Sequence, residues 1–255
     1  MRSAIALAAT AIILVACPAA RATDVDLSLS THYSVGDYGG KGDVDIVYVP
    51  AVARFEAGAW TLKAIIPFLR ISGGTTTVEG PTGPIETKNG TSEGLGDVVL
   101  AGSYTISPLA SWAPFLEIGA RTKLPTADED QGLGTGEFDF TPELELARRY
   151  GRWTPFASVG FRVLGDASDV TYRDGLLASA GLMFRLFDRI EPGVFAYWKE
   201  AATKGADDAY ELLPVLRVEV TEHWIVDAYA SVGFTDSTPD AGGGLEIHYR
   251  IRDAL

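Results

Sequence analysis

Uncharged and charged residues alternate along nine extended segments in the second part of this chain. In the segment 210–220, every second residue from Tyr210 to Val220 is uncharged. The three charged residues, Glu211, Arg217 and Glu219, all lie at positions between them. A period of two places successive side chains on opposite faces of a sheet. The pattern therefore predicts nine strands, each with one apolar face. They span residues 97–106, 114–124, 137–148, 153–164, 176–186, 190–199, 210–220, 224–234 and 243–251.

The charged residues of these nine segments share one face and carry both signs. The exception is Arg148, at a strand end from which a long side chain can reach a polar layer. Asp97, Glu191, Lys199 and Arg250 belong to the charged face. Thirteen further members are candidates to line the lumen of a closed barrel. They are Glu117, Arg121, Lys123, Asp139, Glu143, Glu145, Arg162, Arg185, Glu211, Arg217, Glu219, Asp227 and Glu246.

Three earlier strands, 24–36, 43–55 and 60–71, are expected to complete the sheet. Their alternation is less regular, because Arg54 and Arg70 fall on the face that reads as apolar, both near strand ends. The total of twelve is even, as a bacterial outer-membrane barrel requires. Proline lacks the N–H that a strand ladder needs, so we expect bulges or displaced boundaries at the prolines inside strands. These are Pro142, Pro192 and Pro214.

Connection lengths and aromatic residues distinguish a membrane barrel from a soluble β-sandwich, which also alternates. Short connections (56–59, 107–113, 149–152, 187–189, 221–223) alternate with long ones (72–93, 125–136, 165–175, 200–209, 235–242). Aromatic side chains collect at both strand ends, as membrane interfaces favour. One group contains Trp60, Trp112, Trp153 and Trp224, and the other contains Phe138, Phe140, Trp198, Tyr210 and Phe234. The sequence therefore predicts an all-β, 12-stranded antiparallel up-and-down transmembrane barrel.

The N-terminal segment 1–22 has the features of a secretory signal peptide. Arg2 precedes an apolar run from Ala4 to Ala16, and Ala20-Arg21-Ala22 is a small-x-small cleavage site. Cleavage after Ala22 would leave residues 23–255 as an outer-membrane barrel, with membrane lipid and the barrel assembly machinery as partners. An alternative is a lipobox, Leu14-Val15-Ala16-Cys17, which would place a lipid on Cys17.

Charge and histidine content narrow the chemistry. A net charge of −13 without a basic patch argues against nucleic acid as a partner. His32 and His248 are expected to face the lumen on the first and last strands, at different heights, and His223 lies in a turn. A lipid-modifying barrel enzyme would need a Ser–His pair facing lipid. We therefore predict no catalytic residue, cofactor or metal, and structural roles for the histidines.

Strand number leaves the state of the lumen open. Eight strands enclose no free interior and sixteen leave an aqueous channel, so twelve fits either an open or a plugged barrel. The segment 73–93 could fold over the entrance as a constriction or remain a surface loop. A channel and a plugged structural or surface-interaction barrel are therefore both compatible with the sequence.

Three short motifs resemble a known family. They are Gly94-Leu95-Gly96-Asp97-Val98, Lys123-Leu124-Pro125-Thr126-Ala127-Asp128 and Leu133-Gly134-Thr135-Gly136, within residues 94–165. They are similar to motifs of bacterial outer-membrane proteins assigned to the MetA pathway of phenol degradation, although Ala127 replaces an expected glycine. The resemblance implies a passive channel for small solutes, hydrophobic or aromatic ones included, and it identifies no binding residue. This is our leading hypothesis.

Overall fold

The structure is a computed structural model that describes residues 23–40, 42–80, 83–167 and 170–252. The predicted signal peptide and lipobox lie outside the described residues. Within them the chain forms strands and no helix, and so no helix long and apolar enough to cross a membrane. The strands are β1 (Thr23–Gly36), β2 (Val44–Ala57), β3 (Trp60–Gly73), β4 (Thr77–Glu79), β5 (Pro84–Glu86), β6 (Gly90–Leu95), β7 (Val98–Ile106), β8 (Phe115–Leu124), β9 (Asp139–Ala147), β10 (Trp153–Arg162), β11 (Gly175–Phe184), β12 (Ile190–Lys199), β13 (Ala209–Glu219), β14 (Trp224–Gly233) and β15 (Ala241–Ile251).

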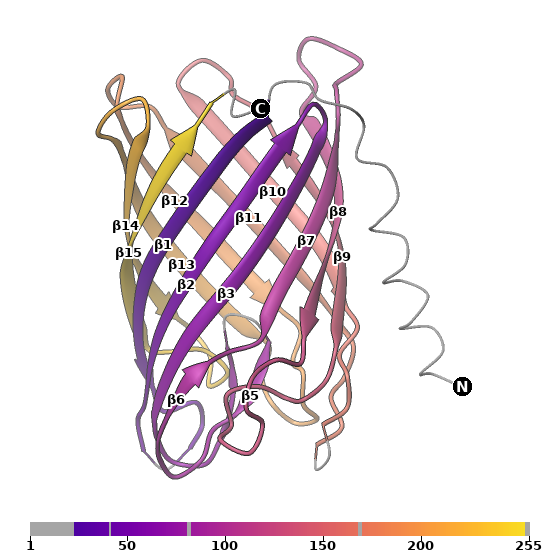
Figure 1. Ribbon diagram of the computed structural model, residues 1–255, viewed down its shortest axis with the longest axis vertical. Helices are drawn as coiled ribbons and strands as arrows, with labels where there is room; N and C mark the ends of the chain where they lie inside the picture. The colour runs from indigo at the N-terminus through magenta and orange to yellow at the C-terminus, as the bar shows by residue number, and fades with distance from the viewer. Residues whose placement is uncertain (1–22, 41, 81–82, 168–169, 253–255) are drawn as a thin grey trace.

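Antiparallel pairing closes the sheet into a tilted barrel (Figure 1). From β7 to β15 each strand pairs with the next one in sequence, β2 pairs with β3, and β1 closes the barrel by pairing with both β2 and β15. β4 and β5 pair only with each other. β6 and β7 pair with successive parts of β3, so the two together count as one strand of the wall. The predicted twelve-stranded antiparallel barrel is confirmed.

The fourth wall strand differs from its predicted bounds. It begins at Gly90 rather than at residue 97, and it is interrupted between Leu95 and Val98. Pro67 of β3 lies opposite the interruption and offers no N–H, but its carbonyl oxygen accepts a hydrogen bond from the Gly96 N–H at 2.9 Å. Pairing resumes between Ile65 and Val99 with one extra residue on the β6–β7 side, so the interruption is a β-bulge next to Pro67.

Pro142 and Pro214 interrupt hydrogen bonding without adding residues. Between β13 and β14, Leu212 pairs with Val232 and Val215 with Tyr229, so the same register continues across Pro214. The β9–β10 ladder likewise stops beside Pro142. The bulges that we expected at these two prolines are therefore not required, because the barrel tolerates local gaps in the ladder.

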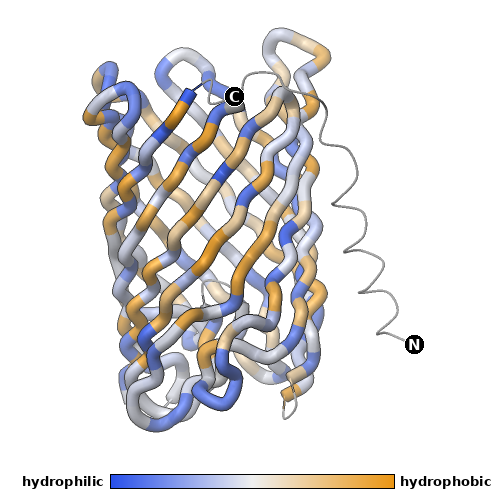
Figure 2. The backbone as a smooth tube through the Cα atoms, viewed as in Figure 1, coloured by the Kyte–Doolittle hydropathy of each residue, from blue (hydrophilic) through white to orange (hydrophobic). Residues whose placement is uncertain are grey.

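The outer surface carries the predicted apolar residues and aromatic belts. Trp60 stacks edge-on against Tyr104 with ring centroids 4.9 Å apart, and Trp224 lies 4.8 Å from Tyr249. Hydrophobic positions recur along the strands of the wall, and hydrophilic positions gather in the loops at the lower end of Figure 2. An apolar exterior between two aromatic belts is suited to contact with lipid.

One prediction about strand orientation is wrong. Arg54 faces the interior, because on β2 the even-numbered side chains point inward: Val44 and Ile46 are buried, while Phe55 is 45% exposed on the outside. The inner face of β2 is apolar at one end because it packs against a hairpin inside the barrel, as described below. Arg70 does lie on the outer face, at the rim.

Candidate functional site

A short hairpin of β4 and β5 packs against the inside of the barrel wall near the long-loop end. We call this end the outer end, because long loops face the cell exterior in such barrels, and the opposite end the periplasmic end. The side chains of Val78 and Ile85 on the hairpin are almost completely buried. They pack in one hydrophobic cluster with Tyr38, Val44, Ile46, Leu69, Ile71 and Leu133. This cluster fixes the hairpin to β2 and β3.

The far side of the hairpin contacts other parts of the wall. Glu79 forms an ion pair with Arg162 of β10, with Oε2 and Nη1 2.8 Å apart. Both side chains are at most 7% exposed. At the hairpin turn, a Cβ on Gly83 would lie 3.1 Å from Asp139 Oδ2, so the turn abuts β9. Of the segment 73–93, the described residues 74–80 and 83–89 thus fold inward and extend from β3 toward β10, as one of our two alternatives proposed, while residues from Gly90 onward belong to β6 of the wall.

The hairpin also leaves little space beside the neighbouring loops. A cavity of only about 20 Å³ separates β4 from the β12–β13 and β14–β15 loops. Its lining residues are Thr77, Val78, Glu79, Ala202, Thr203, Ala206 and Ser237. A volume of this size accommodates about one water molecule. The hairpin therefore narrows the outer end of the lumen, because it contacts β2 and β3 on one side and β10 and two loops on the other.

A buried lysine joins the three sequence motifs into one cluster beside the hairpin. Lys123 Nζ lies 2.8 Å from Asp139 and 3.5 Å from Asp97, and it donates to Thr135 Oγ1 at 2.7 Å. Asp97 in turn accepts the N–H groups of Thr126 and Ala127 at 3.0 and 2.9 Å. Lys123 and Asp97 are almost fully buried. The motifs are therefore anchors that hold the loop 125–136 over the outer end.

Two loop residues at this end have shifted pKa values. Burial in the hydrophobic cluster raises the pKa of the Tyr38 phenol to about 12. The side-chain amide of Gln131 donates a hydrogen bond to Asp128 at 2.7 Å and lowers the pKa of that exposed carboxyl group. Tyr38 therefore remains neutral, and Asp128 remains charged, at physiological pH.

Toward the middle of the lumen the charges become accessible to solvent. Arg121 of β8 pairs with Glu143 of β9 at 3.0 Å, and their side chains are 43% and 33% exposed. Glu117 and Glu145 lie directly opposite each other on the same two strands. Glu211 and Glu219 lie at the outer and periplasmic ends of β13.

One wall of the middle lumen is aromatic. Phe156 and Phe195 meet edge to face with ring centroids 5.9 Å apart, and Tyr197 lies 6.5 Å from Phe195. A Cβ on Gly181 would lie 2.2 Å from the Phe195 ring. The absence of a side chain at Gly181 thus lets this ring lie flat against the wall.

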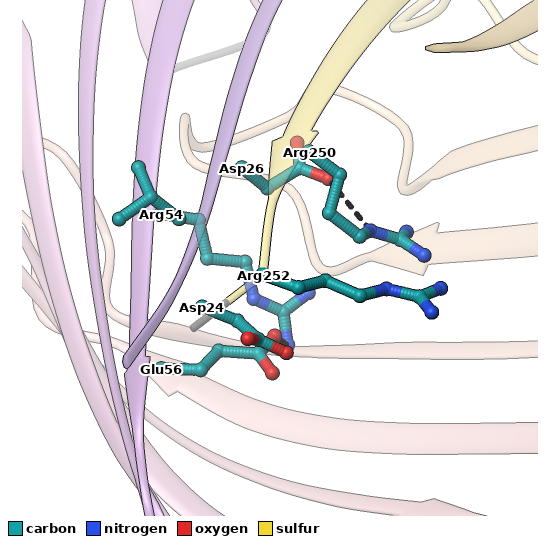
Figure 3. A pocket seen from close by; sticks show the side chains of 7 residues that line it. Asp24, Asp26, Arg54, Glu56, Arg250 and Arg252 are labelled. Carbon is teal, nitrogen blue, oxygen red and sulfur yellow. Dashed lines mark ion pairs between the residues drawn. The ribbon is translucent and has the colours of Figure 1, made fainter. Parts of the chain in front are cut away.

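The periplasmic end contains a vestibule of about 450 Å³ (Figure 3). Its charged lining residues are Asp24, Asp26, Arg54, Glu56, Arg250 and Arg252. Arg54 pairs with Glu56 at 2.8 Å, and Arg250 lies 3.5 Å from Asp26. The Arg54–Glu56 pair is nearly half exposed, so this end of the lumen is hydrated.

Further ion pairs follow the wall from the vestibule. Arg185 and Arg149 both contact Glu191, at 2.7 and 2.5 Å. Arg217 binds Asp227 through two hydrogen bonds of 2.9 and 2.6 Å. This pairing of opposite charges agrees with the presence of both signs on the inner face of the predicted strands.

The three histidines have different surroundings. His32 stacks on Tyr229 with a centroid separation of 5.6 Å, and His223 lies in a turn beside Glu222. His248 lies among Asp26, Asp227 and Glu246. Sequence reasoning missed this last group. The sequence showed only that Glu246 and His248, two residues apart, share one face of a strand. Their neighbours Asp26 and Asp227 are set by how β15 pairs with β1 and β14.

Comparison with known proteins assigns the chain to a family. Residues 29–251 match the family described as "Putative MetA-pathway of phenol degradation". The chain belongs to this family. No curated protein matches it. The match extends the resemblance seen in the three motifs to almost the whole barrel.

Solved structures similar to this member of the phenol-degradation family are outer-membrane barrels. The COG4313 outer membrane channel from Pseudomonas putida F1 has 13% identity and a TM-score of 0.62, over 93% of this chain and 97% of the other. The KdgM porin has 12% identity and a TM-score of 0.52, over 87% and 98%. The translocator domain of the autotransporter NalP from Neisseria meningitidis has 12% identity and a TM-score of 0.51, over 97% and 94%. At these identities the likeness establishes the fold, which is that of the outer-membrane β-barrels.

Proposed function

We propose that the protein is a passive outer-membrane channel for small solutes, in particular small aromatic compounds. The observation that carries the proposal is the gradation inside the barrel: a hydrated, charged lumen leads up to a hairpin that narrows the outer end. The family description supports a link to phenol degradation, and the COG4313 protein of similar fold is described as a channel.

The chemistry of the lumen suits amphipathic solutes. Paired charges of both signs leave no continuous track of one sign, so strong selectivity for anions or cations is not expected. The Phe156–Phe195–Tyr197 wall offers ring faces against which an aromatic solute can pass. The ion pairs elsewhere in the lumen, and the water around them, can solvate its hydroxyl group. Of the thirteen sequence-predicted charged residues, Lys123, Asp139 and Arg162 are buried anchors, and the other ten are proposed to line this path.

The alternative is a structural barrel with a plugged lumen. The burial of Val78 and the tight cavity beside it favour this alternative. The two readings differ in whether solute passes when the hairpin is in place. Conductance and solute flux therefore decide between them.

Conductance in planar bilayers tests the proposal directly. The protein is purified from outer membranes and compared with a variant in which a short Gly-Ser turn replaces residues 75–88, between β3 and β6. We expect a small conductance for the intact chain and a several-fold larger one for the variant. Swelling of liposomes in phenol should exceed swelling in a sugar of similar size. If neither protein conducts, the channel proposal is wrong.

A lipid-modifying enzyme is the remaining class of function. Two of the three histidines lie on the inner face and the third lies in a turn, which does not supply a Ser–His pair facing lipid. A variant with all three histidines changed to glutamine should keep its conductance. Export through cleavage after Ala22, contact with lipid and assembly by the barrel assembly machinery are proposed as the accompanying route to the membrane.

A further inference from the structure

His248 has one ring nitrogen that is held and one that is left without a hydrogen bond. Its Nδ1 lies 3.0 Å from Asp26 Oδ1, which fixes the plane of the ring. Its Nε2 is buried and has no hydrogen-bond partner. A histidine that donates Nδ1–H to a carboxylate presents the Nε2 lone pair outward, and this arrangement is typical of metal-binding histidines.

The unpartnered nitrogen faces two carboxylate oxygens. Nε2 lies 3.5 Å from Asp227 Oδ2 and 3.7 Å from Glu246 Oε1. The three candidate ligand atoms lie within 4.8 Å of one another. In a tetrahedral zinc site with metal–ligand bonds of about 2.0–2.2 Å, neighbouring ligand atoms are roughly 3.4 Å apart. The separations from Nε2 are close to those of ligands that share one ion. Each oxygen also accepts a hydrogen bond, Asp227 Oδ2 from Arg217 at 2.6 Å and Glu246 Oε1 from Ser28 Oγ at 2.7 Å, so an ion would bind through their remaining lone pairs.

Strand register preorganises these three side chains. Glu246 and His248 are two residues apart on β15 and point to the same face. Asp227 on β14 is the direct cross-strand partner of Glu246. Because both strands belong to the closed wall, bringing the ligands together needs no loop movement. The lumen can supply water as a fourth ligand.

The side chains around His248 carry charges of both signs. Three carboxylates surround His248, on Asp26, Asp227 and Glu246. Two arginines offset part of this charge: Arg217 contacts Asp227 and Arg250 contacts Asp26. Lys63 of β3 also lies within electrostatic range of Glu246, so with a neutral imidazole three cationic side chains face the three carboxylates. A proton and a divalent cation would compete for the Nε2 lone pair.

We propose that Asp227, Glu246 and His248 form a binding site for a divalent transition-metal ion of the zinc type, with Asp26 orienting the histidine. The site lies on the inner wall, in the periplasmic half of the barrel. It does not depend on the proposed channel function. Nitrogen and carboxylate donors suit zinc, and cobalt can replace zinc as a coloured probe.

The experiment uses protein purified from outer membranes in detergent and stripped with a chelator. Titration with Co²⁺ at pH 7.5 should give visible absorption bands of a four-coordinate site that saturate at one equivalent. Isothermal titration with Zn²⁺ should give the same stoichiometry. Lowering the pH should weaken binding, because a proton then occupies Nε2.

The matched variants are His248→Gln and His223→Gln. We expect His248→Gln to weaken Co²⁺ binding at least 100-fold and to abolish the absorption bands. His223→Gln, in the exposed turn, should bind as the unaltered chain does. Glu246→Gln is a second variant of the site and should weaken binding about tenfold or more. Heat-modifiable migration on gels verifies that each barrel is folded.

Two results would overturn the proposal. One is the absence of saturable Co²⁺ or Zn²⁺ binding at micromolar concentrations in the folded, unaltered protein. The other is equal binding by the His248→Gln and His223→Gln variants, which would place the ion elsewhere. Both results are independent of whether the barrel conducts.

Discussion

The two ends of the lumen use the same kinds of charged residue in opposite ways. At the outer end, Lys123 and Arg162 are almost fully buried and hold the motif loop and the hairpin in place. At the periplasmic end, Arg54 and Glu56 are nearly half exposed in a vestibule of about 450 Å³. All four side chains point inward from the same closed sheet.

The difference between the ends shows that solvent access, rather than residue type, decides what a lumen charge does. An exposed ion pair contributes about 0–1 kcal/mol, because water solvates each partner almost as well. Loss of one partner of a buried pair costs about 3–5 kcal/mol, because the remaining charge is left unsolvated. The buried Lys123 and Arg162 at the outer end should therefore control structure, and the exposed Arg54–Glu56 pair at the periplasmic end should mainly affect the solute path.

The largest effect is expected for Lys123→Met. The substitution leaves the buried carboxyl groups of Asp97 and Asp139 without their cation, so the free energy of unfolding should fall by about 3–5 kcal/mol. Urea unfolding in detergent micelles measures the change. Lys63→Met is the control, because Lys63 is exposed to the lumen and should cost less than about 1 kcal/mol. Equal losses for the two variants would contradict the comparison.

Glu79→Gln should loosen the hairpin rather than the barrel. Arg162 would then be buried without a countercharge, at a local cost of about 3 kcal/mol. We expect single-channel conductance to rise several-fold and proteases to cleave residues 75–88 faster. Glu93→Gln is the control, since its contact with Arg70 is 3.8 Å long and exposed at the rim. The role assigned to the ion pair would be wrong if both variants conduct alike.

Gly181→Ala tests the aromatic wall. The new methyl group would lie 2.2 Å from the Phe195 ring and should turn that ring into the lumen. We expect a lower flux of phenol in the liposome assay and a stability loss of about 1 kcal/mol from overpacking. Gly102→Ala is the control, because its nearest neighbour would be an ordinary 3.5 Å contact with Leu62. An unchanged flux would show that this wall does not limit passage.

The smallest effect is expected for Glu56→Gln at the vestibule. Its pair with Arg54 is exposed, so stability should change by less than about 1 kcal/mol. Removing one negative charge should shift ion selectivity slightly toward anions, as a reversal potential in a salt gradient measures. A stability loss comparable to that of Lys123→Met would contradict the conclusion that exposed ion pairs in the lumen contribute little to stability.

Sequence alternation predicted most of the wall, because the apolar positions within a strand show which of its side chains face outward. The paired strands β13 and β14 show this, since their outward residues, such as Leu216 and Val232, are exposed as expected. Arg54 shows where the rule fails. Val44 and Ile46 resemble lipid-facing residues in sequence, but they are buried under the hairpin. An apolar side chain in the sequence predicts that it avoids water. It does not show whether lipid outside the barrel or protein inside it covers that side chain.

The sequence by itself determined the twelve-stranded barrel, its two aromatic belts and the mixed charge of its lumen, because these follow from a period of two and from local connection lengths. Only the tertiary structure decided that Glu79 meets Arg162, 83 positions away, and that His248 lies among carboxylates from three strands. Such contacts depend on register and barrel closure. Closure of the barrel brings together side chains that are far apart along the chain, and no repeating pattern in the sequence predicts these contacts.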